Sequence, residues 1–96
     1  MSFRDDLIAS RRLAMLRLVK EQEGCNESVL NIGIHALGFR KTSRQETRDD
    51  LRWLEKRDLV TIEMVRDTVM VATVTDRGRE AAAGRGEPVE GLERPE

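Results

Sequence analysis

The sequence predicts a single α+β domain in which three helices precede a two-stranded β-hairpin and a short helix follows it. Up to residue 57 the apolar side chains recur three and four positions apart, as in helices, whereas residues 59–74 alternate with the two-residue period of strands. A chain of 96 residues is also too short for two separate hydrophobic cores. We therefore expect one domain over residues 1–84 and a tail over residues 85–96.

The first helix is predicted over residues 5–23, because no Gly or Pro interrupts the chain before Gly24. Its apolar side chains form two neighbouring lines: Leu7, Ala14 and Leu18, and beside them Ile8, Met15 and Val19. Such a wide apolar arc can contact both a core and a second subunit. It is equally typical of the central core helix of a small domain, and both interpretations stay open.

The second helix follows the N-cap residues Asn26 and Ser28 and ends before Gly38, which suits a left-handed position after a helix. Its apolar line is Leu30, Ile34 and Leu37.

The third helix is predicted over residues 44–57. Thr42 and Ser43 are candidate caps, and Ser43 with Glu46 has the spacing of a capping box. Its apolar line is Thr47, Leu51 and Leu54.

Residues 59–65 and 68–74 are rich in β-branched side chains and flank the dipeptide Arg66-Asp67, which is the length of a tight hairpin loop. Thr75 or Asp76 can cap a short last helix through residues 77–83, ending at Gly84. The final segment holds both prolines and an acidic excess, so we expect a flexible tail.

Net charge is −1, which argues against a protein that coats nucleic acid by bulk charge. The charge is unevenly distributed, however. Residues 85–96 carry two bases and four acids, whereas residues 40–57 carry seven bases and four acids. The basic excess therefore gathers around the third helix.

Several classes of function are disfavoured. With one cysteine there is no intramolecular disulfide, and no apolar run is long enough for a signal peptide or a membrane span, so we expect a soluble protein of a bacterial cytoplasm. Cys25 and His35 are too few for a metal sensor. No catalytic or nucleotide-binding motif is present, and we expect neither an enzyme nor a cofactor.

The predicted element order is that of a winged helix-turn-helix domain, in which the third helix can enter a DNA major groove beside the hairpin. The stretches LRWLEKRDLV (residues 51–60) and VTDRGREAA (residues 74–82) resemble parts of the MarR, PadR and ArsR-type regulators. The chain as a whole resembles small winged-helix proteins of Mu-like phages and prophages. That likeness runs through residues 43–54, VMVATVTDRG (residues 69–78), AAGR (residues 82–85) and the closing G-L-x-R-P. It implies a phage DNA-binding protein, often labelled ArsR-like.

On this hypothesis the third helix contacts double-stranded DNA. Arg44, Arg48 and Arg52 recur every four residues, opposite the apolar line, and arginine forks suit guanine edges and phosphates. The full set of candidate contacts comprises Arg40, Lys41, Ser43, Arg44, Gln45, Arg48, Arg52 and Arg66. We expect a homodimer through the first helix and a role in transcription regulation.

Two alternatives remain. The arginines can belong to a solvated face, paired with Glu46, Asp49, Asp50 and Glu55; a carboxylate at Asp49 would either accept from a cytosine or repel phosphate, and Asp50 can instead be an internal partner of Arg57 or of the first helix. The same fold can also serve as a module that docks another phage protein without binding DNA.

Overall fold

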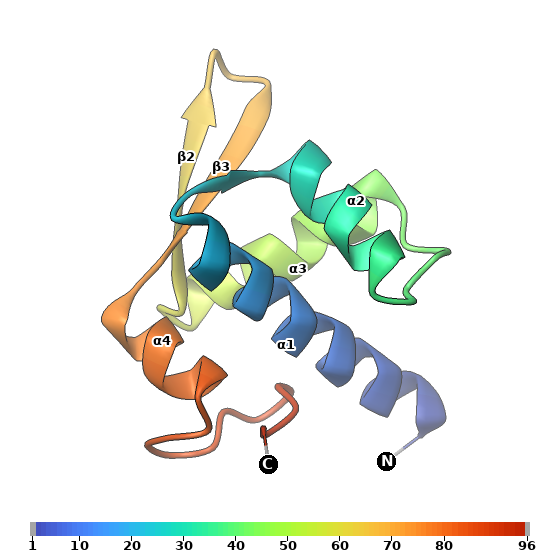
Figure 1. Cartoon of the computed structure of the whole chain (residues 1–96), viewed down its shortest axis with the longest axis vertical. Coiled ribbons are helices and arrows are strands. Elements are labelled where there is room, and N and C mark those ends of the chain that lie inside the picture. The colour runs from blue at the N-terminus through green and yellow to red at the C-terminus, as the bar shows by residue number, and fades with distance from the viewer. Residues whose placement is uncertain (1, 96) are drawn as a thin grey trace.

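The computed structural model describes residues 2–95, which form an α+β fold of four helices and a three-stranded antiparallel sheet (Figure 1). In chain order the elements are α1 (Phe3–Gln22), β1 (Cys25–Asn26), α2 (Glu27–Ala36), α3 (Arg44–Lys56), β2 (Val60–Val65), β3 (Val69–Val74) and α4 (Asp76–Ala82). The four expected helices and the hairpin are confirmed, each within a few residues of the predicted bounds.

The predicted caps explain where the helices begin. The side chains of Asn26, Ser43 and Thr75 each accept a hydrogen bond from the backbone N–H three residues later. The capping box of Ser43 and Glu46 is confirmed, and α1 has another between Ser2 and Asp5 that we did not predict. These contacts are local, so most could be recognised from the sequence.

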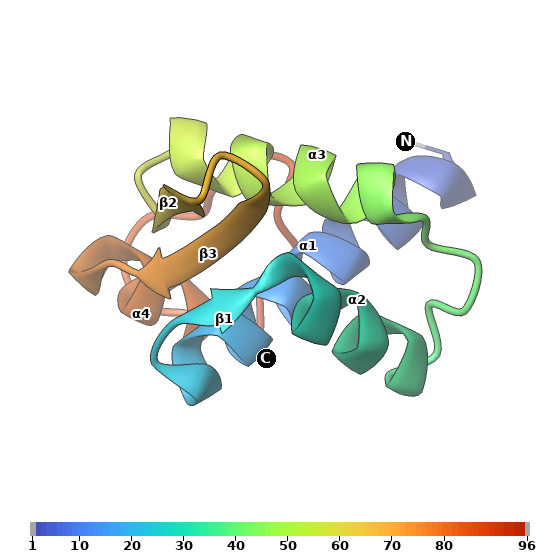
Figure 2. The same cartoon turned by 90° about the horizontal axis from the view of Figure 1, so that it is seen from above.

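The sheet differs from the two-stranded expectation by one strand. β1 pairs with β3, with Cys25 opposite Ala72 and Asn26 opposite Val71, and the strand order is β1-β3-β2. Two residues are too few to show a period of two, and the partner strand lies more than forty positions away. This pairing makes β3 the central strand and holds the chain between α1 and α2 against the hairpin (Figure 2).

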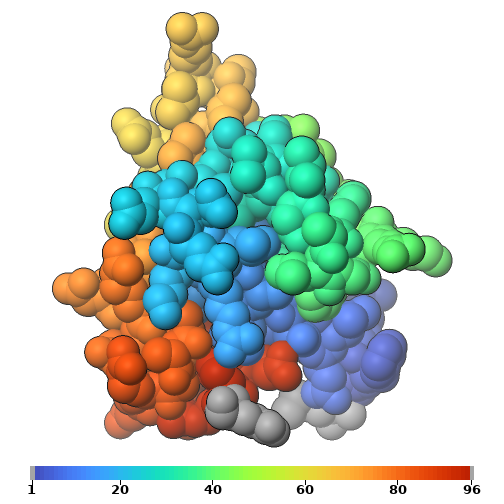
Figure 3. All heavy atoms as spheres, viewed as in Figure 1, coloured from blue at the N-terminus to red at the C-terminus, as the bar shows by residue number. Residues whose placement is uncertain are grey.

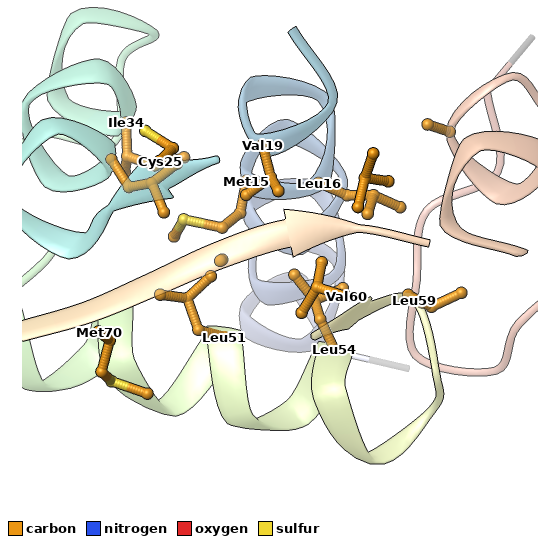
Figure 4. Close-up of a cluster of buried hydrophobic side chains, with 14 residues drawn as sticks. Met15, Leu16, Val19, Cys25, Ile34, Leu51, Leu54, Leu59, Val60 and Met70 are labelled. Carbon is orange, nitrogen blue, oxygen red and sulfur yellow. The ribbon is translucent and has the colours of Figure 1, made fainter. Parts of the chain in front are cut away.

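The core lies between α1, α2, α3 and the sheet (Figure 4). Met15, Leu16 and Val19 from α1 meet Leu51 and Leu54 from α3, all fully buried. Of the two apolar lines on α1, Met15 and Val19 enter the core, whereas Leu7 is exposed. The hairpin packs its base on this core, and its loop extends beyond the helices (Figure 1).

A flexible tail was expected over residues 85–96, of which the structure describes residues 85–95; its mobility stays a prediction, and the described residues lie against the domain. Val89 and Leu92 pack on the core, the backbone N–H of Glu93 donates to the Ala9 carbonyl at 3.3 Å, and Arg94 donates to the Gly84 carbonyl at 2.9 Å. This segment turns back between α4 and α1 (Figure 1).

Neither a membrane span nor a metal cluster appears in the described part of the chain. Its helices are too short or too polar to cross a bilayer. Residues 2–95 contain no group of three or more His, Cys, Asp or Glu side chains that could hold a metal ion.

Candidate nucleic-acid interface on α3

Helix α3 is held by its inner face. Thr47, Asp50, Leu51 and Leu54 are buried, and Asp50 is clamped by Arg11 of α1. Burial raises the pKa of Asp50 despite this arginine. Asp50 is thus an internal partner of the first helix, one of the two roles that the sequence left open. The opposite face of α3 carries the predicted DNA contacts, with Arg44, Gln45 and Arg52 exposed and Arg48 half-buried.

The sequence analysis missed one residue at this face, Glu27. It is the first residue of α2, and it is only 1% exposed. Its carboxylate accepts from Nε and Nη2 of Arg48, the latter at 2.6 Å, and from Nη2 of Arg44 at 3.3 Å. These hydrogen bonds, with that of Arg48 foremost, lower the pKa of Glu27 although its burial acts in the opposite direction.

Nothing in the sequence connects Glu27 with the arginines of α3. An acid in the first turn of a helix is ordinarily explained by the helix dipole, and here the partners are 17 and 21 residues away. They meet only because α2 and α3 pack together, with the Asn31 amide donating to Thr47 Oγ1 at 2.9 Å.

Arg48 also reaches the β2–β3 hairpin. Its Nη2 donates to the backbone carbonyl of Thr68, the last residue of the hairpin loop, at 2.8 Å. The Arg48 guanidinium therefore links its own helix, α3, to Glu27 of α2 and to Thr68 of the hairpin. This contact fixes the hairpin relative to the exposed face of α3.

Two further polar pairs of α3 lie within the helix. Arg52 Nη1 lies 3.0 Å from Glu55 Oε1, and Gln45 Nε2 donates to Asp49 Oδ1 at 2.9 Å. The expected pairing of Arg52 with Glu55 on a solvated face is thus present. Arg44 and Arg48 instead pair with Glu27, which was not among the acids considered.

The segment before α3 presents Arg40 and Lys41 to solvent. It is anchored through the Thr42 carbonyl, which accepts from Asn31 Nδ2 and lies 2.7 Å from His35 Nε2. His35 thus holds this segment, which protrudes from the molecule (Figure 3).

Ser43 forms the capping box of α3 with Glu46. Its hydroxyl accepts from the Glu46 N–H, and the Ser43 backbone N–H donates to Glu46 Oε1. The capping box therefore engages the Ser43 N–H, whereas the hydroxyl, which only accepts here, keeps its O–H donor for a phosphate.

Arg66 lies at the tip of the hairpin and is exposed. Arg66 and Asp67 have φ values of 53° and 56°, and the Thr68 N–H donates to the Val65 carbonyl at 3.2 Å. Positive φ at both central residues is typical of a type I′ turn. Because Val65 pairs with Val69, three residues, Arg66 to Thr68, separate the last paired positions, one more than the predicted dipeptide. The loop is tight although it contains no glycine.

Trp53 and Cys25 pack within the domain, away from the exposed face of α3. The Trp53 ring lies under two guanidiniums, with Arg12 Cζ at 4.1 Å and Arg57 Cζ at 3.8 Å from its centroid. Cys25 is buried in β1, which raises the pKa of its thiol. Trp53 is thus not placed among the exposed arginines of α3.

Comparison with known proteins gives two relatives. The chain is 40% identical over 78 residues to an uncharacterized protein of Haemophilus influenzae, covering 80% of this chain and 76% of that protein. It is 38% identical over 92 residues to the uncharacterized protein gp26 of Escherichia phage Mu, covering 95% and 93% of the two chains. No family model matches. The second relative agrees with the expected likeness to small proteins of Mu-like phages.

Proposed function

The chain belongs to the family of gp26 of Escherichia phage Mu, and we propose that it is a winged-helix DNA-binding protein of a Mu-like phage or prophage, acting in transcription regulation as a homodimer. The activity proposed is binding, without catalysis, metal or cofactor, and its setting is the cytoplasm of the bacterial host.

The fold supports this proposal by the placement of α3 and the hairpin. A helix-turn-helix protein inserts its recognition helix into the major groove, while neighbouring elements contact the backbone. Here α3 exposes one face, and the β2–β3 hairpin extends beside it as a wing would (Figure 2). The short strand β1 attaches the hairpin to the helices through β3.

The observation that carries the proposal is the basic rim around this face. Arg40 and Lys41 precede α3, Arg44 and Arg48 follow along it, and Arg66 is at the hairpin tip. Among the described residues, Glu27 is the only ion-pair partner of Arg44 and Arg48. These two cations and one anion therefore retain a net positive charge. Positive charge on an exposed helix face is what phosphate contacts require.

The first half of α1 supports dimer formation. Phe3 and Leu7, one helical turn apart, are 81% and 44% exposed. Neighbouring exposed apolar side chains of this kind are typical of a surface that contacts another protein. A two-fold axis beside α1 would set Phe3 and Leu7 of one copy against the same apolar patch of the other, leaving the basic rim of α3 to DNA.

The test is duplex binding by paired variants. The Arg40→Ala/Lys41→Ala variant removes two exposed charges that form no ion pair within residues 2–95, and Arg44→Ala/Arg48→Ala removes two charges from α3. The matched control is Arg77→Ala/Arg79→Ala, which removes two exposed charges from α4. At about 50 mM salt we expect both first variants to bind a random duplex at least tenfold more weakly, with the control unchanged.

The binding results test the proposal only for variants that are folded. Circular dichroism melts establish that the variants are folded at the assay temperature, since Arg44→Ala/Arg48→Ala leaves Glu27 unpaired. DNA binding is rejected if the wild-type protein has no measurable affinity for duplex DNA under these conditions, or if the control loses as much affinity as the other two.

A second candidate function is docking to another phage protein. It is favoured by Val29 and Ile32, which are 48% and 69% exposed at neighbouring positions of α2, and by the acids that pair with the polar side chains of α3. Capture of a stoichiometric protein partner that survives nuclease treatment and is lost in Ile32→Asp would favour this function over DNA binding.

A further inference from the structure

Two acids are buried at α3, and only one has an evident structural purpose. Asp50 is held by Arg11 and ties α3 to α1. Glu27 lies at the opposite, outward side, and within residues 2–95 its ion-pair partners are Arg44 and Arg48. A carboxylate that is 1% exposed beside two guanidiniums that are 57% and 37% exposed has the geometry of an anchor beneath them.

The two arginines are engaged to different extents. Arg48 donates from both Nε and Nη2 to Glu27, and these two donors form one fork of the guanidinium. Nη2 also donates to Thr68. Arg48 therefore keeps Nη1 for any further partner. Arg44 uses only one N–H of Nη2, in one longer contact of 3.3 Å, so the second Nη2 N–H stays beside a free Nε or Nη1 donor and one two-donor fork remains available. A guanine edge needs two donors side by side, whereas one donor is enough for a phosphate oxygen.

We propose that Glu27 assigns different roles to these two arginines: Arg44 reads a base, and Arg48 is a positioning residue that orients Arg44 and the hairpin. The inference rests on the proposed DNA-binding function and deepens it. Glu27 itself contacts no DNA. It limits the motion of both guanidiniums before DNA arrives, so that less side-chain entropy is lost on binding.

Restraint of the arginines by Glu27 can be distinguished from a simpler role, the neutralisation of their charge. If Glu27 only neutralised charge, replacing it by Gln would add one net positive charge and strengthen binding to every DNA sequence alike. If it restrains the arginines, the same change strengthens or preserves non-specific binding but lowers discrimination between sequences. The two effects are separable because affinity and discrimination are measured independently.

The experiment uses the full chain and two probes, a pool of random 20-base-pair duplexes whose bound fraction is sequenced, and poly(dI-dC) as the non-specific competitor. Four variants are compared with the wild type: Glu27→Gln, Arg44→Lys, Arg48→Lys and the control Glu63→Gln. Glu63 is exposed on β2 and has no ion pair among the described residues, so its substitution makes the same charge change away from the arginines. Both lysine variants keep the wild-type charge.

We expect Glu27→Gln to lower enrichment of the preferred sequence on the order of tenfold, while its affinity for poly(dI-dC) stays equal or rises. Arg44→Lys should relax the preference at one base pair. Arg48→Lys should weaken it at several positions, because both the hairpin and Arg44 lose their restraint. Glu63→Gln should leave the enriched sequence unchanged.

The outcomes separate this inference from the function on which it rests. Wild-type enrichment with higher affinity for both probes in Glu27→Gln would make Glu27 a neutralising group and overturn the inference while DNA binding stands. So would identical effects of the two lysine variants at one base pair, or a wild-type protein that binds duplexes without enriching any sequence. If Glu27→Gln does not fold, Arg48→Lys decides alone. A wild-type protein that binds neither probe overturns the proposed function and the inference together.

Discussion

Arg11 of α1 holds the carboxylate of Asp50 of α3 with two donors, Nε at 2.6 Å from Oδ2 and Nη2 at 3.1 Å from Oδ1. Both side chains are largely withdrawn from water, with 11% and 3% of their surface exposed. The geometry is that of a guanidinium fork on a carboxylate, which fixes both distance and angle. This pair sets how α3 crosses α1, and therefore how its outer face is presented.

Removal of one member of this pair should be costly. We expect Arg11→Met to lower the free energy of unfolding by about 3 kcal/mol, because it leaves the Asp50 charge buried without its main partner. The double variant Arg11→Met/Asp50→Leu should lose less than the single variant, because no charge remains buried. Urea denaturation of both proteins measures this, and a double variant less stable than Arg11→Met would contradict it.

Gly78 should tolerate no side chain. A Cβ atom built there would lie 2.0 Å from the Leu59 carbonyl oxygen and 2.8 Å from a methyl group of Val74, so the start of α4 would have to move away from the sheet. We expect Gly78→Ala to destabilise the fold by about 3 kcal/mol. Gly33→Ala is the comparison, since its Cβ would meet only the flexible end of Leu18 and alanine favours a helix. Its effect in thermal unfolding should stay within about 1 kcal/mol, and equal losses at both positions would refute the close-approach argument.

The hairpin loop can be improved without altering its shape. Arg66 and Asp67 adopt positive φ, which Asn and Gly adopt more easily. Arg66→Asn/Asp67→Gly should therefore stabilise the protein by about 1 kcal/mol, or roughly 4–8 °C in Tm. The control, Thr73→Asn, alters an exposed position within β3 and should not stabilise the protein. A lower Tm in the loop variant would show that the Arg66 side chain makes a stabilising contact.

The Glu27 cluster should respond to acid. Its arginine partners lower the pKa of Glu27 below the ordinary value of 4.5, so the stabilisation by pairing is fully present above about pH 4.5 and is lost as pH falls through the lower folded value. The difference in unfolding free energy between wild type and Glu27→Gln should shrink between pH 6 and pH 3. The difference between wild type and Glu63→Gln should not follow this course. A difference for Glu27→Gln that grows with acid would mean that burial dominates the pKa of this group.

Trp53 reports on the C-terminal segment. A Cβ at Gly91 would lie 2.7 Å from Trp53 Cζ2, and Arg12, which stacks on the ring, donates to the Gly91 carbonyl at 3.0 Å. Deletion of residues 85–96 should therefore shift the fluorescence of this single tryptophan to longer wavelength. The variant Glu87→Gln, which changes the segment at an exposed position, should leave the emission unchanged. An unchanged spectrum in the deletion would show that the segment is detached in solution.

The sequence by itself determined the features that depend on near neighbours. Periodicity located α1, α2, α3 and the hairpin strands, cap residues located helix starts such as Ser43, and Arg66-Asp67 located the loop. These features arise from hydrogen bonds and apolar spacing over a few residues, which the chain records directly. The outward placement of Arg44 and Arg52 followed from the same spacing.

Only the tertiary structure decided which distant groups meet. β1 exists because Cys25 and Asn26 lie beside β3, and the segment after Gly84 packs because Val89 and Leu92 find the core. Glu27 reaches Arg44 and Arg48 because α2 packs on α3, so two arginines expected to be free or paired along their own helix share a buried carboxylate. Such pairings depend on the relative positions of whole elements, and no local pattern of residues encodes them.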